Sequence, residues 1–495
     1  MQQIVDVAVV GAGFGGLCAA IRLRESGVAS IVILERGNEV GGTWRDNTYP
    51  GCACDVPSHL YSFSFAPNKH WSRPYPQQQE IQDYILRVTD SFNLRPMIRF
   101  QCEAQSLHWL ADRQCWKVVL KDHEPLLARS VILATGPLNK PAIPDIPGIE
   151  KFAGESFHSG QWSHAANLQG KRIAVVGTGA SAIQFVPEIA TDAEQVDVFQ
   201  RTPAWVVPRW DQPYGALRRW AYRYVPGLQR LSRWRVYWFN EWIGMAFMGS
   251  QRMQHMLQRL AGLHLNQQVT KPAMRQALTP DFSPGCKRLL ISNTWYPSLQ
   301  RPNVTLVTQA VSAIAPAGVV GVDGTVYPCD VIIWGTGFKA TEFVAPMQVF
   351  GEAGGAYLVG STPDGVPELG DIWRKQPAAT RLGITVAGFP NLFMLVGPST
   401  GLGHNSIIFM IECQVHYIVQ ALNHLRLTKH GALRLRPDVQ REDYTQIQRK
   451  MKSTVWTSGC KSWYQNPDGQ IDTLWPGYTW EYWLKTRRFE VGDYL

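Results

Sequence analysis

Gly11-Ala12-Gly13-Phe14-Gly15-Gly16 is the stretch that decides the fold of this chain of 495 residues. An apolar run at 6–10 precedes it, and a segment with helical spacing at 17–26 follows it. A second apolar run, 30–34, then leads to Glu35. The order predicts a strand, a glycine turn, a helix and a second strand, which together form a dinucleotide-binding βαβ unit.

Each glycine of this turn has a physical task. Gly11 makes the tight turn, Gly13 lets a pyrophosphate approach the backbone, and Gly16 lets the helix pack against the strand. The helix N-terminus supplies amide donors to the phosphates. We expect Glu35 to accept hydrogen bonds from ribose hydroxyls. Its carboxylate would repel a 2′-phosphate, so this unit favours FAD or NAD over NADP.

The same order of elements returns at 172–202, around Gly177-Thr178-Gly179-Ala180-Ser181-Ala182. Here the second strand ends in Arg201 and Thr202 instead of an acidic residue. A guanidinium can pair bidentately with a 2′-phosphate, and the missing carboxylate removes the repulsion. This unit therefore predicts an NADP(H) site, with Lys287 as a candidate second partner of the phosphate. A vestigial module with an exposed basic turn is the alternative.

Two such units predict an α/β fold with two Rossmann-like dinucleotide-binding domains, one for FAD and one for NADP. Proline-rich connectors flank the second unit. After it the composition changes to Arg, Trp, Leu, Gln and Met at helical spacing, which predicts an inserted helical segment. We expect a split FAD-binding domain at 1–140 and 376–495, a split NADP-binding domain at 141–210 and 283–375, and a helical insertion at 211–282.

Composition narrows the class of protein without choosing a function. Hydrophobic residues make up 45% of the chain, as in an ordinary folded protein, and the net charge of +9 suits anionic cofactors, nucleic acid or an anionic membrane alike. The nine cysteines contain no CxxC pair, and no histidine cluster has metal-ligand spacing. We therefore expect a reduced, cytoplasmic protein without a metal site, a signal sequence or a membrane span.

Two nucleotide sites imply that electrons pass from NADPH to FAD, which leaves the final acceptor to be identified. Flavoprotein disulfide reductases share the two-module plan and carry a Cys-x4-Cys redox pair directly after a Gly-Gly-Thr. Here Gly41-Gly42-Thr43 is followed by Trp44, and Cys52 and Cys54 are too close together to match. The sequence thus argues against a thiol relay. Without a haem or iron–sulfur motif, molecular oxygen is the expected acceptor and co-substrate.

The segment between the two units, Phe152-Ala-Gly154-Glu-Ser-Phe-His158-Ser-Gly-Gln-Trp162, resembles the FxGxxxHxxxW motif of Baeyer–Villiger monooxygenases. That family continues with Pro or Asp, from which Ser163 departs. The related N- and S-oxygenating flavin monooxygenases end the motif with Tyr, so Trp162 favours the ketone-oxidising branch. The resemblance extends over nearly the whole chain.

By this resemblance, Arg288 is the active-site arginine and Asp55 orients it. The implied task of the guanidinium is to stabilise an anionic C4a-peroxyflavin and then the oxyanion formed on the attacked carbonyl. The implied reaction converts a small apolar ketone, NADPH and oxygen into an ester or lactone. The resemblance also implies FAD contacts for Thr43, Trp44, Asp55 and Tyr61, NADP contacts for Arg201, Thr202 and Lys287, and a cover over the nicotinamide nucleotide formed by Trp463.

These assignments have alternatives. Arg288 could be a surface arginine, Trp463 plain packing, and His158 a hydrogen-bonding linker residue instead of a proton donor, with Trp162 as a hinge anchor. At the level of function, the alternatives are an N- or S-oxygenating monooxygenase, a flavin reductase or oxidase that releases hydrogen peroxide, and then a non-oxygenating flavoprotein. The sequence leaves the ketone and the oligomeric state open.

Basic and aromatic residues intermingle along 217–265. Helices of this composition can form the wall of an apolar substrate pocket, or can make weak contact with a membrane surface. We favour the pocket wall, because the resembled family places a helical insertion here. No nucleic-acid-binding motif accompanies the charge, so nucleic acid is not expected as a partner.

Overall fold

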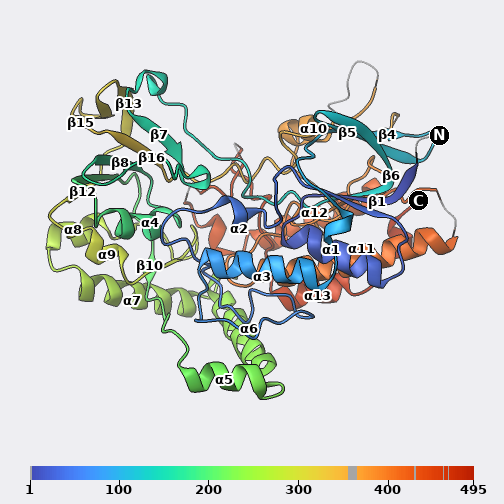
Figure 1. Cartoon of the computed structure of the whole chain (residues 1–495), viewed down its shortest axis with the longest axis horizontal. Coiled ribbons are helices and arrows are strands. Elements are labelled where there is room, and N and C mark those ends of the chain that lie inside the picture. Colours follow the sequence, from blue (N-terminus) through green and yellow to red (C-terminus); the bar gives the residue numbers. More distant parts are fainter. Residues whose placement is uncertain (1–2, 355–364, 429–430, 461, 467) are drawn as a thin grey trace.

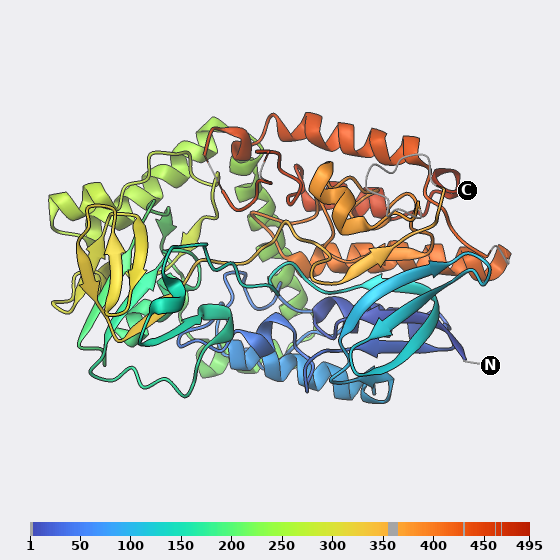
Figure 2. The same ribbon diagram turned by 90° about the horizontal axis from the view of Figure 1, so that it is seen from above.

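The computed structural model describes residues 3–354, 365–428, 431–460, 462–466 and 468–495. Two sheets lie at opposite ends of the long axis of the molecule (Figures 1 and 2). Each sheet contains one of the two glycine turns, and helices from both halves of the chain cover them. The expected α/β fold with two Rossmann-like domains and a helical insertion is confirmed.

The larger sheet is built on the first glycine turn. Strand β1 pairs in parallel with β2 on one side and with β6 on the other, so that Val10 lies between Leu34 and Leu133. Buried neighbours on both sides explain the uninterrupted apolar run of β1. The strand order is β17-β4-β5-β6-β1-β2-β3, and β18 also pairs with β6. The strands are β1 (Ile4–Val10), β2 (Ile31–Leu34), β3 (Ile98–Arg99), β4 (Ala104–Leu110), β5 (Cys115–Leu120), β6 (His123–Leu133), β17 (Gln348–Phe350) and β18 (Leu392–Met394).

The second sheet is parallel throughout, with the order β12-β9-β8-β16-β7. Its registers align His158, Val176, Phe199 and Trp334, so the carboxyl ends of four strands meet at one edge. Ligands of open parallel sheets bind at this edge. The strands are β7 (Glu155–His158), β8 (Arg172–Val176), β9 (Gln195–Phe199), β12 (Val304–Val307) and β16 (Val331–Trp334). Two smaller sheets join β10 (Val206–Val207) to β11 (Leu290–Ile291), and β13 (Val311–Ala315) to β14 (Gly318–Gly321) and β15 (Val326–Pro328).

The C-terminal part of the chain returns to the larger sheet. Helix α1 packs against α11, and α11 packs against α13, as Figure 1 shows below the larger sheet. Strand β17 pairs with β4 of the same sheet. The chain therefore re-enters the larger sheet before residue 376, the position at which the second part of the FAD-binding domain was expected to begin. A three-residue strand carries too little pattern for its pairing to be predicted. The helices are α1 (Phe14–Glu25), α2 (Thr43–Asp46), α3 (Gln78–Ser91), α4 (Ala182–Ile189), α9 (Trp295–Ser298), α10 (Leu369–Lys375), α11 (Ile407–Thr428), α12 (Pro437–Met451) and α13 (Thr479–Thr486).

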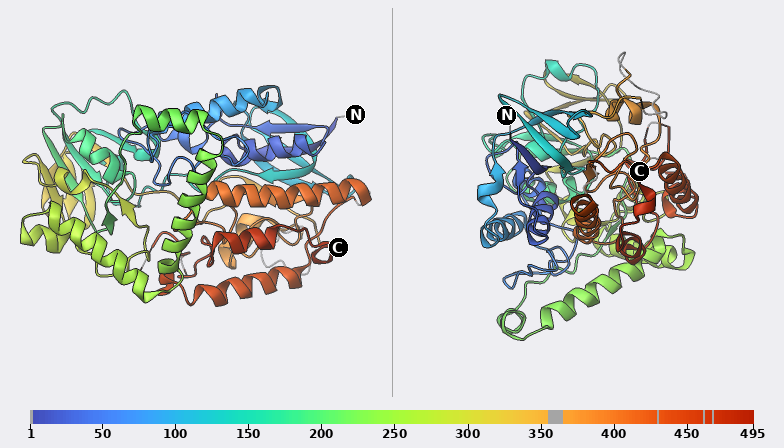
Figure 3. Two further views of the ribbon diagram at one scale, coloured as in Figure 1. Left: turned by 90° about the horizontal axis from the view of Figure 1, so that it is seen from below. Right: turned by 90° about the vertical axis from the view of Figure 1, so that its right-hand side faces the viewer.

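The insertion consists of α5 (Ala216–Tyr224), α6 (Leu228–Phe247), α7 (Gln251–Gln268) and α8 (Pro272–Ala277). Helices α5 and α6 project from the body of the molecule (Figure 3). The pocket-wall prediction is wrong for the aromatic residues of α6 that face outward, since Trp234 and Trp238 are 55% and 50% exposed. Within the described residues, no helix combines the length and the apolar character needed to cross a bilayer.

Candidate active site

The first glycine turn has no room for a side chain at two of its glycines and open space at a third. A Cβ added to Gly11 would lie 2.6 Å from the backbone oxygen of Ala134, and one added to Gly16 would lie 1.9 Å from the backbone oxygen of Gly11. A Cβ added to Gly13 would meet nothing closer than 3.7 Å. No side chain caps the N-terminus of α1, so its amides face this open cradle. The geometry fits a dinucleotide pyrophosphate.

The second turn repeats this geometry at the edge of the second sheet. Gly177 has a φ of +109°, and a Cβ there would lie 2.5 Å from the backbone oxygen of Gly335. A Cβ on Gly179 would meet nothing closer than 3.9 Å. Thr178, Ser181 and Ala182 complete the turn, with Ser181 immediately before α4. The chain therefore holds two cradles of the same kind, one on each sheet.

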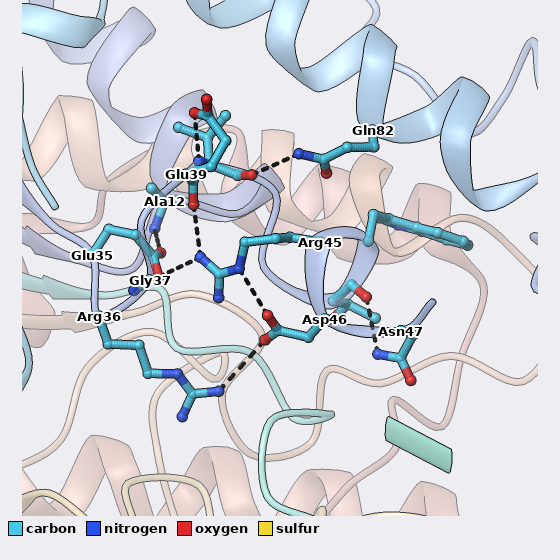
Figure 4. Close-up of polar contacts among 12 residues, drawn as sticks. Ala12, Glu35, Arg36, Gly37, Glu39, Arg45, Asp46, Asn47 and Gln82 are labelled. Carbon is cyan, nitrogen blue, oxygen red and sulfur yellow. Dashed lines mark hydrogen bonds and ion pairs between the residues drawn. The ribbon is translucent and has the colours of Figure 1, made fainter. Parts of the chain in front are cut away.

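Glu35 fixes the loop that follows the first cradle. Its carboxylate is buried and accepts the N–H groups of Ala12 at 2.9 Å and Gly37 at 2.7 Å. Arg45 donates to the same carboxylate at 2.7 Å and to Asp46 at 2.7 Å, as Figure 4 shows. Burial lowers the pKa of Arg45, but its hydrogen bonds to Asp46 and Glu35 outweigh that effect and raise it. Arg45 could not be predicted from the sequence, because a single arginine in a loop carries no signal of its partner.

Two aromatic residues, Trp44 and Tyr61, contact each other beyond this loop. Thr43 opens α2, and the indole N–H of Trp44 donates to the hydroxyl of Tyr61 at 3.0 Å. Burial raises the pKa of the Tyr61 hydroxyl well above its usual value, and the neighbouring Arg288 guanidinium opposes this rise. The structure thus places Thr43 and Trp44 on α2 and joins Trp44 to Tyr61, whose hydroxyl lies within the electrostatic influence of Arg288.

Arg288 and Asp55 meet although 233 residues separate them in sequence. Nε and Nη2 of Arg288 donate to Oδ2 of Asp55 at 2.8 and 2.5 Å. The two side chains are 32% and 28% exposed, so the pair is sheltered by protein but open on one side. The charge of Asp55 raises the pKa of Arg288 beyond its usual value, although burial opposes it. The result is a permanently charged guanidinium held in one orientation.

Tyr464 is a site residue that the sequence analysis did not single out. It is buried, and burial raises the pKa of its hydroxyl, while the nearby Arg288 lowers it. Its neighbour Trp463 has a ring centroid 4.3 Å away and is 46% exposed. Tyr464 is therefore turned into the protein, whereas Trp463 faces solvent. The sequence marked this segment, but it gave no sign of which ring points inward.

Cys286 and Cys460 form a disulfide with Cα atoms 6.2 Å apart. The expectation of a fully reduced chain is therefore wrong for this pair, whereas seven other cysteines are free and buried. Since 174 residues separate the two partners, no local spacing could have signalled the bridge. The bridge ties the segment before Arg288 to the segment before Trp463.

Three basic or hydroxyl side chains predicted for the 2′-phosphate gather beyond the second cradle. The ammonium of Lys287 donates to the hydroxyl of Thr202 at 3.2 Å, and Arg201 is exposed beside them. Burial first, and then the charge of Arg201, lower the pKa of Lys287. An open pocket of about 300 Å³ adjoins this group, lined by Gln200, Arg201, Pro203, Ala273, Gln276, Ala277 and Thr308. The site is cationic and uncrowded, which suits an anionic nucleotide.

The residues of the motif between the two units make packing contacts and backbone hydrogen bonds. His158 is buried at the end of β7, and its Nδ1 accepts the N–H of Gly160 at 3.0 Å, which requires an unprotonated nitrogen there. Burial also lowers the pKa of His158. A Cβ on Gly154 would lie 2.2 Å from a backbone oxygen, and Phe152 packs against the second sheet. Trp162 packs against Phe185 of α4, with ring centroids 5.4 Å apart. These contacts favour the linker role over proton transfer.

Comparison with known proteins agrees with this geometry. A model of flavin-binding monooxygenase-like proteins matches residues 5–233. A Baeyer–Villiger monooxygenase of Streptomyces coelicolor is 43% identical, covering 100% of this chain and 93% of its own length. One of Pseudomonas aeruginosa is 41% identical, covering 99% and 90%. A crystal structure of OTEMO in complex with FAD and NADP has a TM-score of 0.85 at 26% identity and covers 98% of both chains. The chain therefore belongs to the Baeyer–Villiger monooxygenases, within the flavin-binding monooxygenases.

Proposed function

We propose that this enzyme, an FAD-dependent NADPH monooxygenase, converts a small apolar ketone into an ester or lactone through an anionic oxygen held by Arg288. The observation that carries the proposal is the ion pair of Arg288 with Asp55, whose two side chains stay partly exposed. Membership of the family supports the same chemistry.

FAD fits the first cradle and NADP(H) fits the second. The residues that would hold FAD are Gly11, Gly13 and Gly16 at the pyrophosphate, Glu35 at the ribose, and Thr43, Trp44, Asp55 and Tyr61 toward the flavin. When bound, the flavin takes a hydride from NADPH and activates molecular oxygen. The protein's own contribution is then positioning, exclusion of water and stabilisation of charge.

Arg288 supplies the stabilisation of charge. A guanidinium stays protonated throughout the reaction, so it holds negative charge on oxygen without donating its proton and quenching the nucleophile. The same group then faces the oxyanion that forms on the carbonyl carbon. Asp55 keeps the fork in place and offsets the cost of bringing the arginine into a sheltered site. The buried Tyr464 lies near enough to Arg288 for the guanidinium to lower the pKa of its hydroxyl.

Recognition of NADP(H) rests on the second cradle and its cationic margin. Arg201, Lys287 and Thr202 would bind the 2′-phosphate, and the adjoining pocket of about 300 Å³ has room for the adenosine end. Trp463, exposed and tied to the Arg288 segment by the disulfide, is available to cover the nicotinamide end. We place the enzyme in the cytoplasm, since the seven buried free thiols fit a reducing environment and the bridge between Cys286 and Cys460 is the one exception among the described cysteines.

The test is Arg288→Ala in the FAD-loaded enzyme, with Arg288→Lys beside it. Flavin reduction by NADPH should persist, because no donor to the nicotinamide is removed. Ester formation from a ketone should fall about 10²–10³-fold, as when one donor to a developing oxyanion is lost, with the oxidised NADPH accounted for as hydrogen peroxide. Arg113→Ala, an exposed arginine of the β4–β5 turn, is the matched control. Unchanged ester yield in Arg288→Ala would remove this residue from the mechanism.

A further inference from the structure

Helix α6 differs from an ordinary surface helix before its last turns, because charged side chains point inward there while large apolar side chains are exposed. On the inner side, Arg233 donates to the backbone carbonyls of His59, Leu60 and Ser62 at 3.0, 3.2 and 2.8 Å. Glu241, also on the inner face, is 4% exposed and accepts the hydroxyl of Thr479. The outer face instead carries Leu231, Trp234, Trp238 and Trp242, which are 58%, 55%, 50% and 45% exposed.

The spacing of these outer residues shows that they form one continuous stripe. Positions 231, 234, 238 and 242 follow the three- and four-residue repeat of a helix, so their side chains lie above one another on one side. Helix α5 carries a second exposed set with the same repeat, namely Leu217, Trp220 and Tyr224, which are 79%, 54% and 58% exposed. We call these seven residues the aromatic face. Both helices lie at the outside of the molecule (Figure 3), and the exposed fractions show that the described residues leave this face uncovered.

The charges beside the aromatic face have one sign. Arg219, Arg223, Arg230 and Arg235 are exposed on α5 and α6. Across 216–247 Glu241 is the single acidic residue, and it is buried and engaged with Thr479. The surface therefore combines half-exposed tryptophans with unopposed arginines.

This combination selects the kind of partner. A partner must cover apolar rings and also neutralise positive charge, and an anionic phospholipid surface does both at once, with acyl chains beneath a layer of phosphates. A second copy of the chain fits less well, because a two-fold interface would bring the arginines of both copies together without an acidic residue on either face. Membrane docking is also compatible with helices that do not cross the bilayer.

We propose that α5 and α6 dock the enzyme on an anionic lipid surface. The tryptophans enter the boundary between headgroups and acyl chains, and the arginines contact lipid phosphates. The proposal goes beyond the proposed oxygenation reaction, and it does not depend on which ketone is oxidised. Docking would bring the enzyme to the phase into which an apolar ketone partitions.

The experiment is vesicle flotation of the FAD-loaded enzyme with phosphatidylcholine alone or with phosphatidylcholine containing phosphatidylserine. The native enzyme should float with the anionic vesicles. The double substitution Trp234→Ser and Trp238→Ser should weaken this binding about tenfold or more, because the apolar contribution is lost. Arg219→Glu with Arg223→Glu should abolish the preference for phosphatidylserine.

The matched controls are Leu427→Ser and Val322→Ser, at apolar positions that are 78% and 63% exposed outside the insertion. They should float like the native enzyme. FAD content and ketone oxidation in free solution should stay unchanged in all variants, which separates docking from folding and from the proposed reaction. Absent or composition-independent flotation, or undiminished flotation of the tryptophan variant, would overturn the proposal. So would a dimer in sedimentation velocity that the same tryptophan substitutions dissociate, since the aromatic face would then join two copies.

Discussion

Removing the charge of Asp55 while keeping its shape is the sharpest probe of the candidate site. Asp55→Asn retains an oxygen that can accept from Nε or Nη2 of Arg288, the two atoms that now bind the carboxylate at 2.8 and 2.5 Å. What disappears is the attraction between opposite charges. The guanidinium then remains sheltered without a counter-ion, and its orientation is no longer fixed.

The structure sets the size of the effect. Charge centres roughly 4 Å apart attract by about 1 kcal/mol in water and about 4 kcal/mol at the effective dielectric of a protein surface. Because the side chains are 32% and 28% exposed, the pair lies between these limits. A loss of about 2 kcal/mol corresponds to an approximately 30-fold fall in kcat/KM for ester formation.

The assay compares ester formed with NADPH consumed, in the native enzyme, Asp55→Asn, Arg288→Lys and the double variant. If the two residues act as one unit, kcat/KM for ester formation in the double variant should be about equal to that of the less active single variant, because each substitution removes the same interaction. Fully additive losses, or an Asp55→Asn enzyme within about threefold of the native one, would refute the reasoning.

Other consequences can be measured separately. Arg201→Ala should raise the KM for NADPH about 10–100-fold and leave that for NADH unchanged, because a charged partner of the 2′-phosphate is lost; equal shifts would argue against this role. Cys286→Ser should lower the free energy of unfolding by about 2–4 kcal/mol in urea titrations, and reductant should do the same to the native enzyme alone. Burial, then Arg218 and Arg233, lower the pKa of His59 to about 4. Folding therefore favours its neutral form, an advantage that is present above about pH 6.5 and is lost as the pH falls toward 4. His59→Asn should remove about 2 kcal/mol of the decline in stability between pH 7 and pH 4.5, and an unchanged pH profile would count against it.

The sequence predicted those features whose physical cause is local. Gly11 and Gly177 each sit between a buried strand and a helix, and a chain that must turn sharply there has few other choices of residue. The missing acid after β9 and the presence of Arg201 are equally local, and the prediction of NADP at the second cradle rests on that one short segment. The family motif at His158 and Trp162 identified the branch.

The features that the sequence did not reveal depend on contacts over long distances. Arg45 pairs with Glu35 because of the way the intervening loop folds, and Cys286 pairs with Cys460 across 174 residues. Tyr464, near the C-terminal end of the chain, lies close enough to Arg288 for the guanidinium to affect its pKa. The meeting of Asp55 with Arg288 came from resemblance and not from spacing. The outward face of α6 was also hidden, because helical periodicity shows that a helix has two faces but does not show which one meets the protein.

The bridge between Cys286 and Cys460 limits how far two parts of the candidate site can separate. Arg288 follows one half of the bridge by two positions and Trp463 follows the other half by three. With Cα atoms 6.2 Å apart at the bridge and at most about 3.6 Å of reach per residue, their own Cα atoms stay within about 24 Å of each other. The bridge therefore keeps Trp463, proposed to cover the nicotinamide nucleotide, within a fixed reach of the candidate active-site arginine.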